Sequence, residues 1–110
     1  MTDLGKIERE LIQARQAQAE GNPGKARVCA RRAAGLAIRA YYQRREGPGW
    51  GGDAMTQLKR LQADESVPEP VRQAAARLTT KVDLEHTLPF EEDPVEDARG
   101  IIRYWAGEAR

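Results

Sequence analysis

Apolar residues recur with the spacing of an α-helix along most of this chain. The first such stripe consists of Leu4, Ile7, Leu11 and Ala14. It predicts a helix over residues 3–20. Asn22 can cap the next helix, and Pro23 suits the first position of that helix because the missing N–H of proline is not needed there. The short Gly-Asn-Pro turn before the second helix, 23–46, predicts an antiparallel hairpin.

Helix start signals mark three further segments. Asp53 follows a glycine-rich run and can cap a short helix. Ser66 and Glu69 have the spacing of a capping box, and Asp93 followed by Pro94 marks the start of the last helix. No segment alternates with period two over a useful length. The sequence therefore predicts an all-α fold, a single five-helix bundle domain over residues 1–110 with an up-down antiparallel core. The five expected helices are 3–20, 23–46, 54–64, 68–82 and 94–108, with a loop over 83–92.

The long helix separates into two faces at 100° per residue. One face carries small and apolar residues: Ala26, Cys29, Ala30, Ala33, Ala34, Leu36, Ala37, Ala40 and Tyr41. The other carries Lys25, Arg27, Arg31, Arg32, Arg39 and Arg45. The small residues predict a close approach of neighbouring helices. The opposite face predicts a basic surface, on which Tyr42 lies between Arg31 and Arg39.

Composition places the chain among helical, water-soluble domains. Hydrophobic residues make up 40% and charged residues 32%, while aromatic residues are scarce at 5%. No apolar run approaches the roughly 20 residues that a membrane span needs, and the first residues pass directly into an amphipathic pattern, so no secretory signal is expected. The single Cys29 cannot form an internal disulfide, which favours the cytoplasm, and its place on the small-residue face predicts a buried thiol.

Charge is unevenly distributed although the net charge is only +1. Residues 1–60 carry 12 basic and 6 acidic side chains, whereas residues 61–110 carry 6 basic and 11 acidic side chains. Such an asymmetry can attract an anion to one side or pair the protein with a second copy of itself. It can equally be neutralised within the bundle.

The order of these signals resembles the HEPN domain family, the helical bundles named for higher eukaryotes and prokaryotes nucleotide-binding. The resemblance is carried by the opening helix, the turn over 21–26, the segment 30–41 and the closing segment 93–102. It implies a helical bundle of a kind that often forms homodimers, and many such bundles partner a small nucleotidyltransferase in toxin–antitoxin or related systems. Some members cleave RNA through an arginine and a histidine separated by four to six residues.

That catalytic motif is not matched cleanly in this sequence. The sole histidine, His86, lies nine positions after Arg77, and the residue at the family's spacing is Lys81. In the last helix Arg99 has the right spacing, but Tyr104 stands where the histidine would be. A non-catalytic protein is therefore expected. A diverged ribonuclease that uses Lys81 or Arg77 with His86 is an alternative, and Arg99 and Tyr104 are further weak catalytic candidates.

The basic face supplies the candidate binding site. Guanidinium groups bind phosphate bidentately, and Tyr42 could stack on a base. The candidate phosphate-binding arginines are Arg27, Arg31, Arg32 and Arg39. One His and one Cys at distant positions make no metal-ligand set, and no cofactor is expected. The sequence predicts a HEPN-like binding module for RNA or a nucleotide, or a partner of a nucleotidyltransferase. A homodimeric protein–protein interaction bundle is the alternative.

Overall fold

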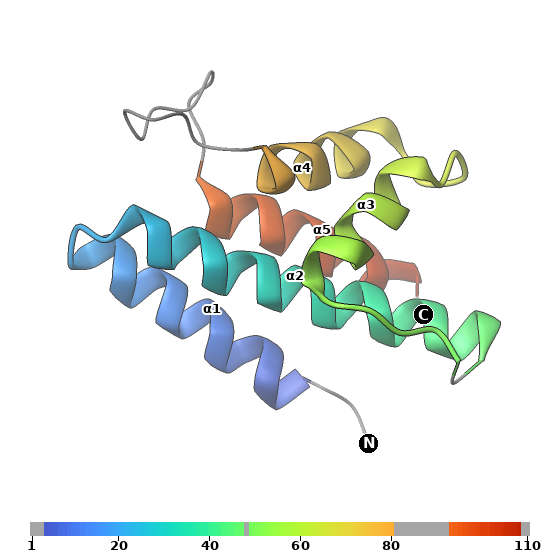
Figure 1. Ribbon diagram of the computed structural model, residues 1–110, viewed down its shortest axis with the longest axis horizontal. Helices are drawn as coiled ribbons and strands as arrows, with labels where there is room; N and C mark the ends of the chain where they lie inside the picture. The colour runs from blue at the N-terminus through green and yellow to red at the C-terminus, as the bar shows by residue number, and fades with distance from the viewer. Residues whose placement is uncertain (1–3, 48, 81–92, 109–110) are drawn as a thin grey trace.

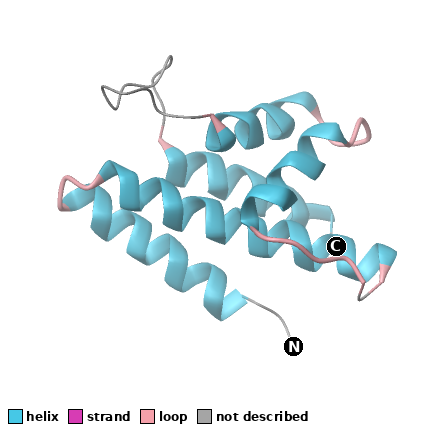
Figure 2. Cartoon of the chain, viewed as in Figure 1, coloured by secondary structure: helices cyan, strands magenta, loops and turns pink. Residues whose placement is uncertain are grey.

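The computed structural model describes residues 4–47, 49–80 and 93–108, and this part of the chain holds five α-helices and no β-strand (Figures 1 and 2). The helices are α1 (Leu4–Ala19), α2 (Pro23–Glu46), α3 (Ala54–Ala63), α4 (Glu69–Thr79) and α5 (Pro94–Glu108). The predicted all-α class is confirmed. Each helix lies within a few residues of its expected range, and the expected loop over 83–92 lies outside the described residues. No described helix is long and apolar enough to cross a bilayer.

The centre of the bundle is α2, which contacts each of the other four helices. Figure 1 shows α2 running back along α1 after a tight turn, with α5 behind α2 and α4 beside α5. The buried residues of α2 are mostly alanines, among them Ala30, Ala33 and Ala34, each fully buried. Because alanine adds little radius at a contact, several helices can pack around one central helix.

Three of the predicted N-terminal caps are present. The Asn22 side chain accepts a hydrogen bond from the backbone N–H of Lys25 at 3.1 Å. Asp53 accepts one from Thr56 at 2.9 Å, and Asp93 accepts from the first turn of α5. Gly21 has a φ of 74°, which lets the chain reverse between α1 and α2. These local signals fix where the helices begin.

The capping box predicted at Ser66 is wrong. The N-cap position of α4 is held by Pro68, which makes no side-chain cap bond. The backbone N–H and hydroxyl of Ser66 instead both donate to the Asp64 carboxylate, at 3.0 and 2.6 Å. The serine closes the turn after α3 because an acidic partner lies only two residues away.

A close contact joins α2 to the start of α3. A Cβ atom placed on Gly35 would lie 2.7 Å from the Cα of Ala54 and 2.8 Å from its Cβ. Real Cβ atoms do not approach backbone so closely, so position 35 needs a glycine for the two helices to pack as they do. This contact also sets the position of α3 relative to the middle of α2.

Aromatic side chains gather at one end of the bundle. The five that the structure describes are Tyr41, Tyr42, Trp50, Tyr104 and Trp105. Tyr41 stacks on Trp105 with ring centroids 3.8 Å apart, and Tyr42 stacks on Trp50 at 4.5 Å. The indole N–H of Trp50 donates to the buried Gln57 side chain at 2.6 Å. Trp50 therefore folds back from its glycine-rich loop onto the core.

Candidate functional site

The predicted basic face of α2 is split by the packing of α4. Arg27 is 5% exposed, and its guanidinium donates to the backbone carbonyls of Arg77 at 3.0 Å and Leu78 at 3.2 Å, and to that of Thr80. Arg31 donates through Nε to the Leu78 carbonyl as well. The last carbonyls of a helix have no partner within it, so these two arginines complete the C-terminus of α4. They hold α4 against α2 and do not lie on an open surface.

Tyr42 also differs from its predicted place on that face. The side chain is 6% exposed, its ring packs on Trp50, and its hydroxyl donates to the Asp64 carboxylate. Burial, followed by the bond to Asp64, raises the pKa of the Tyr42 hydroxyl well above its usual value. Hydrogen bonds from Ser66 and Tyr42 lower the pKa of Asp64. Tyr42 is thus a core residue, because α2 is surrounded by helices and leaves little of its circumference open.

The weak catalytic candidates are distributed over different interactions. Arg77 binds Asp97 bidentately, with Nη2 2.8 Å from Oδ1 and Nε 3.1 Å from both oxygens, which ties α4 to α5. Arg99 is exposed and lies 3.6 Å from Glu96, and Tyr104 packs edge-on against Trp105. Lys81 and His86 lie outside the described residues.

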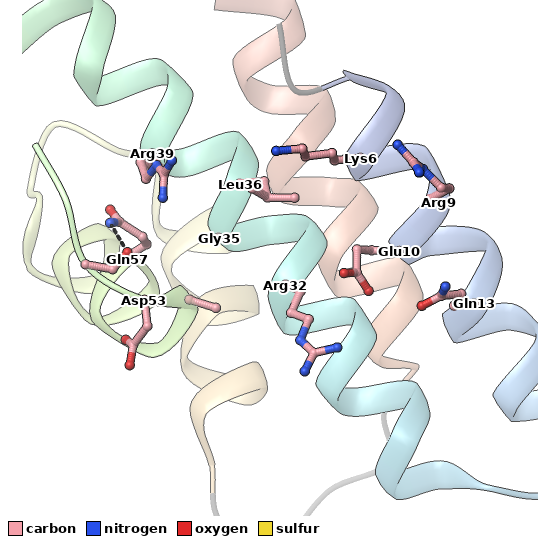
Figure 3. A pocket seen from close by; sticks show the side chains of 12 residues that line it. Lys6, Arg9, Glu10, Gln13, Arg32, Gly35, Leu36, Arg39, Asp53 and Gln57 are labelled. Atoms are coloured by element: carbon pink, nitrogen blue, oxygen red, sulfur yellow. Dashed lines mark hydrogen bonds between the residues drawn. The ribbon is translucent and has the colours of Figure 1, made fainter. Parts of the chain in front are cut away.

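The remaining two arginines, Arg32 and Arg39, line an open groove of about 490 Å³ (Figure 3). The floor of the groove is formed by Gly35 and Leu36 of α2, and Gly35 lets the start of α3 lie directly against α2. The side of α1 contributes Lys6, Arg9, Glu10 and Gln13, and the start of α3 contributes Gly52, Asp53, Ala54 and Gln57. The groove thus crosses the middle of α2, with α1 on one side and the start of α3 on the other.

Lys6 and Arg9, the two basic residues that α1 contributes to the groove, are not among the residues predicted from the sequence. Lys6, Arg9 and Gln13 follow one another at intervals of three and four residues, so they share a flank of α1. Arg32 and Arg39 are one heptad apart on α2 and share a flank of that helix. Each pattern is visible in the sequence, but the alignment of the two flanks depends on how α1 packs on α2.

Basic side chains dominate the electrostatics of the groove. None of Lys6, Arg9, Arg32 and Arg39 makes a salt bridge with a described residue. The two carboxylates in the lining are Glu10 and Asp53. The backbone and hydroxyl of Thr56 lower the pKa of Asp53, which is engaged as the cap of α3. The groove therefore carries a formal charge of +2, and none of its four cations forms a salt bridge with a described carboxylate.

Neutral-pH proton transfer and metal binding have little basis in this lining. Across the described ranges, no three His, Cys, Asp or Glu side chains gather to hold a metal ion. Cys29 is 1% exposed, and burial together with the nearby Glu10 carboxylate raises the pKa of its thiol. A buried thiol with a raised pKa is unreactive. What the groove lining offers is a set of basic side chains, Lys6, Arg9, Arg32 and Arg39.

Comparison of the chain with models of protein families, with curated proteins and with solved structures finds no match.

Proposed function

We propose that the protein binds a phosphate-bearing ligand, a nucleotide or RNA, in the groove between α1, α2 and the start of α3. The observation that carries the proposal is the convergence of Lys6, Arg9, Arg32 and Arg39 on one groove, with no salt bridge to a described residue. The HEPN-like pattern of the sequence implies the same class of ligand. It also implies a nucleotidyltransferase partner, which stays a proposal from the resemblance alone.

The physical case begins with the guanidinium groups. Arg32 and Arg39 can each offer two parallel N–H donors to phosphate oxygens, and Lys6 and Arg9 add charge from the facing helix. A concave surface lined by one sign of charge raises the local concentration of counter-ions. A volume of about 490 Å³ falls within the range of small-ligand pockets. Size and charge therefore agree on an anionic ligand of nucleotide dimensions or a short stretch of a chain.

The test measures the fluorescence anisotropy of a labelled nucleotide and of a short labelled single-stranded RNA at low and moderate salt. The Arg32→Gln/Arg39→Gln variant should weaken binding about tenfold or more, because two charge-assisted contacts are lost. The matched control is Arg44→Gln/Arg103→Gln, which removes the same charge from exposed positions outside the groove. An equal loss in both variants would show that net charge, and not the groove, determines binding.

The RNA is then run on a gel. Intact RNA after incubation agrees with a non-catalytic binding protein. Cleavage that disappears in His86→Ala would contradict that role and support the diverged ribonuclease. If neither ligand binds at either salt, the proposal fails, and light scattering behind a sizing column would then test the homodimeric interaction bundle.

A further inference from the structure

A carboxylate with unused hydrogen-bonding capacity lies among the cations of the groove. Oε1 of Glu10 is buried and has no hydrogen-bond partner within the described part of the chain. Figure 3 shows Glu10 extending from α1 toward α2, between Arg9 and Arg32. Buried acceptors are nearly always paired in folded proteins, so an unpaired one at a binding surface points to a missing donor.

The other carboxylate of the groove wall and its two amides are already engaged, and Gln13 accepts from the Cys29 thiol at 3.9 Å. Asp53 caps α3 by accepting from Thr56 at 2.9 Å. Gln57 accepts from Trp50 and donates to the carbonyls of Gly51 and Gly52 at 2.9 and 3.1 Å. Glu10 also lies beside the Cys29 thiol, whose pKa is raised by burial and by this carboxylate, but Oε1 of Glu10 has no hydrogen-bond partner among the described residues. Because the terminal torsion of a glutamate is broad, a small rotation can turn that oxygen to the groove.

We propose that Glu10 selects the base of a bound nucleotide by accepting its N–H donors, which favours guanine over adenine. This inference rests on the proposed function, since the phosphates would occupy the cations beside Glu10. Guanine presents two adjacent donors, N1–H and the N2 amino group, to the two oxygens of a carboxylate. The corresponding edge of adenine pairs its amino donor with an acceptor nitrogen, and that nitrogen would face a carboxylate oxygen. Of these two bases, only guanine can donate to both carboxylate oxygens without placing an acceptor nitrogen against one of them.

The placement of the aromatic residues favours a small nucleotide over a single strand of RNA. Sequence-tolerant binding of single strands uses exposed aromatic rings on which successive bases stack. Tyr41, Tyr42, Trp50, Tyr104 and Trp105 pack against the core, and none of them lines the groove. A ligand held here is therefore recognised through charge and hydrogen bonds, which a mononucleotide offers in compact form.

The test is isothermal titration calorimetry of the full chain with guanosine diphosphate, adenosine diphosphate, inosine diphosphate and pyrophosphate. The wild-type protein should bind guanosine diphosphate about tenfold more tightly than adenosine diphosphate, the discrimination expected of a two-donor contact. Inosine diphosphate, which lacks the N2 amino group, should fall between them. These comparisons need no variant. Equal affinities for the guanine and adenine ligands would overturn the role of Glu10.

The variant Glu10→Gln sharpens the test because it should move two ligands in opposite directions. Binding of guanosine diphosphate weakens to the level of adenosine diphosphate, while pyrophosphate binds at least as tightly because a negative charge has left the groove. A structural role for Glu10 would weaken all ligands alike and would overturn the inference. If the wild-type protein does not bind even pyrophosphate, the proposed function itself fails. If pyrophosphate binds and the bases are not distinguished, only base selection fails.

Discussion

Arg31 and Arg32 are neighbours in the sequence, and they belong to two different parts of the molecule. Arg31, with Arg27, donates to the backbone carbonyls at the end of α4. Arg32, with Arg39, lines the groove on the other side of α2. Consecutive residues of a helix point about 100° apart, so a helix packed on several sides can place them in unlike environments. A run of arginines on a central helix is thus not by itself a binding surface, and its members must be judged one by one.

The largest expected difference separates Arg27 from Arg32. Arg27→Ala leaves the carbonyls at the end of α4 without their charged donor and should lower the free energy of unfolding by about 3 kcal/mol. Arg32→Ala, at an exposed position, should change it by less than about 0.5 kcal/mol. Urea unfolding followed by circular dichroism measures both. Equal losses would break the distinction between the two sets of arginines.

A substitution at Gly35 tests the close contact between α2 and the start of α3, which forms one side of the groove. Alanine at an exposed helical position usually gains up to about 1 kcal/mol over glycine. At position 35 the new methyl group would meet the Ala54 backbone, so Gly35→Ala should instead destabilise the protein by about 1–3 kcal/mol. The thermal midpoint measures the sign. Gly5→Ala is the control, because a Cβ at position 5 would meet nothing within 4 Å. This substitution should stabilise the protein slightly.

Tyr42 gives an intermediate effect with a distinct dependence on pH. Because the folded protein raises the pKa of this hydroxyl above its ordinary value of 10.0, the contribution of the neutral group is fully present below pH 10. It is lost progressively as the pH rises above 10. Tyr42→Phe removes a bond to Asp64 worth about 1 kcal/mol at neutral pH. The variant should therefore lose less stability than the wild type between neutral and strongly alkaline pH.

Asp64, the partner of Tyr42, makes stability depend on pH in the opposite direction. The folded protein lowers the pKa of Asp64 below 3.8, so its contribution is present above that pH and is lost as the pH falls below it. Urea unfolding of the wild type and of Tyr42→Phe, at acid and at alkaline pH, measures how the free energy of unfolding changes in each range. An identical alkaline slope in the two proteins would exclude Tyr42 as its source.

The smallest effect concerns the groove cations, and its sign is informative. Four basic groups on one groove repel one another, so Arg39→Gln should slightly stabilise the free protein at low salt. The gain, within about 0.5 kcal/mol, should disappear at ~1 M salt, where charges are screened over a few ångströms. Thermal melts at the two salt concentrations measure it. A loss of stability that salt does not change would show that Arg39 has a packing role.

The sequence predicted the five helices well because their signals are local. Asn22, Asp53 and Asp93 cap their own helices, and the stripes of apolar residues have the helical period. The capping box predicted at Ser66 was wrong because the Asp64 carboxylate accepts hydrogen bonds from Ser66. The spacing of Ser66 and Glu69 does not reveal that a nearer partner is available.

The site was predicted less well than the fold. Arg27 and Tyr42 were assigned to an open face on the assumption that α2 has one buried side. The contacts of α2 with four helices make that assumption wrong. Arg32 and Arg39 do line a groove. Lys6, Arg9 and Glu10 come from α1, so an analysis of the faces of α2 alone does not find them.

The attachment of α1 bears on how the groove opens. The described contacts of α1 are mainly with α2, and its ties to α5, from Arg15 and Gln18 to Asp93 and Glu96, lie toward its C-terminal end. The first turns of α1, which carry Lys6 and Arg9, have no such tie, so their amide hydrogens should exchange through local opening well before those of α2. A ligand that bridges α1 and α2 would slow that exchange. Protection of the first turns of α1 is therefore a direct measure of occupancy that needs no label on the ligand.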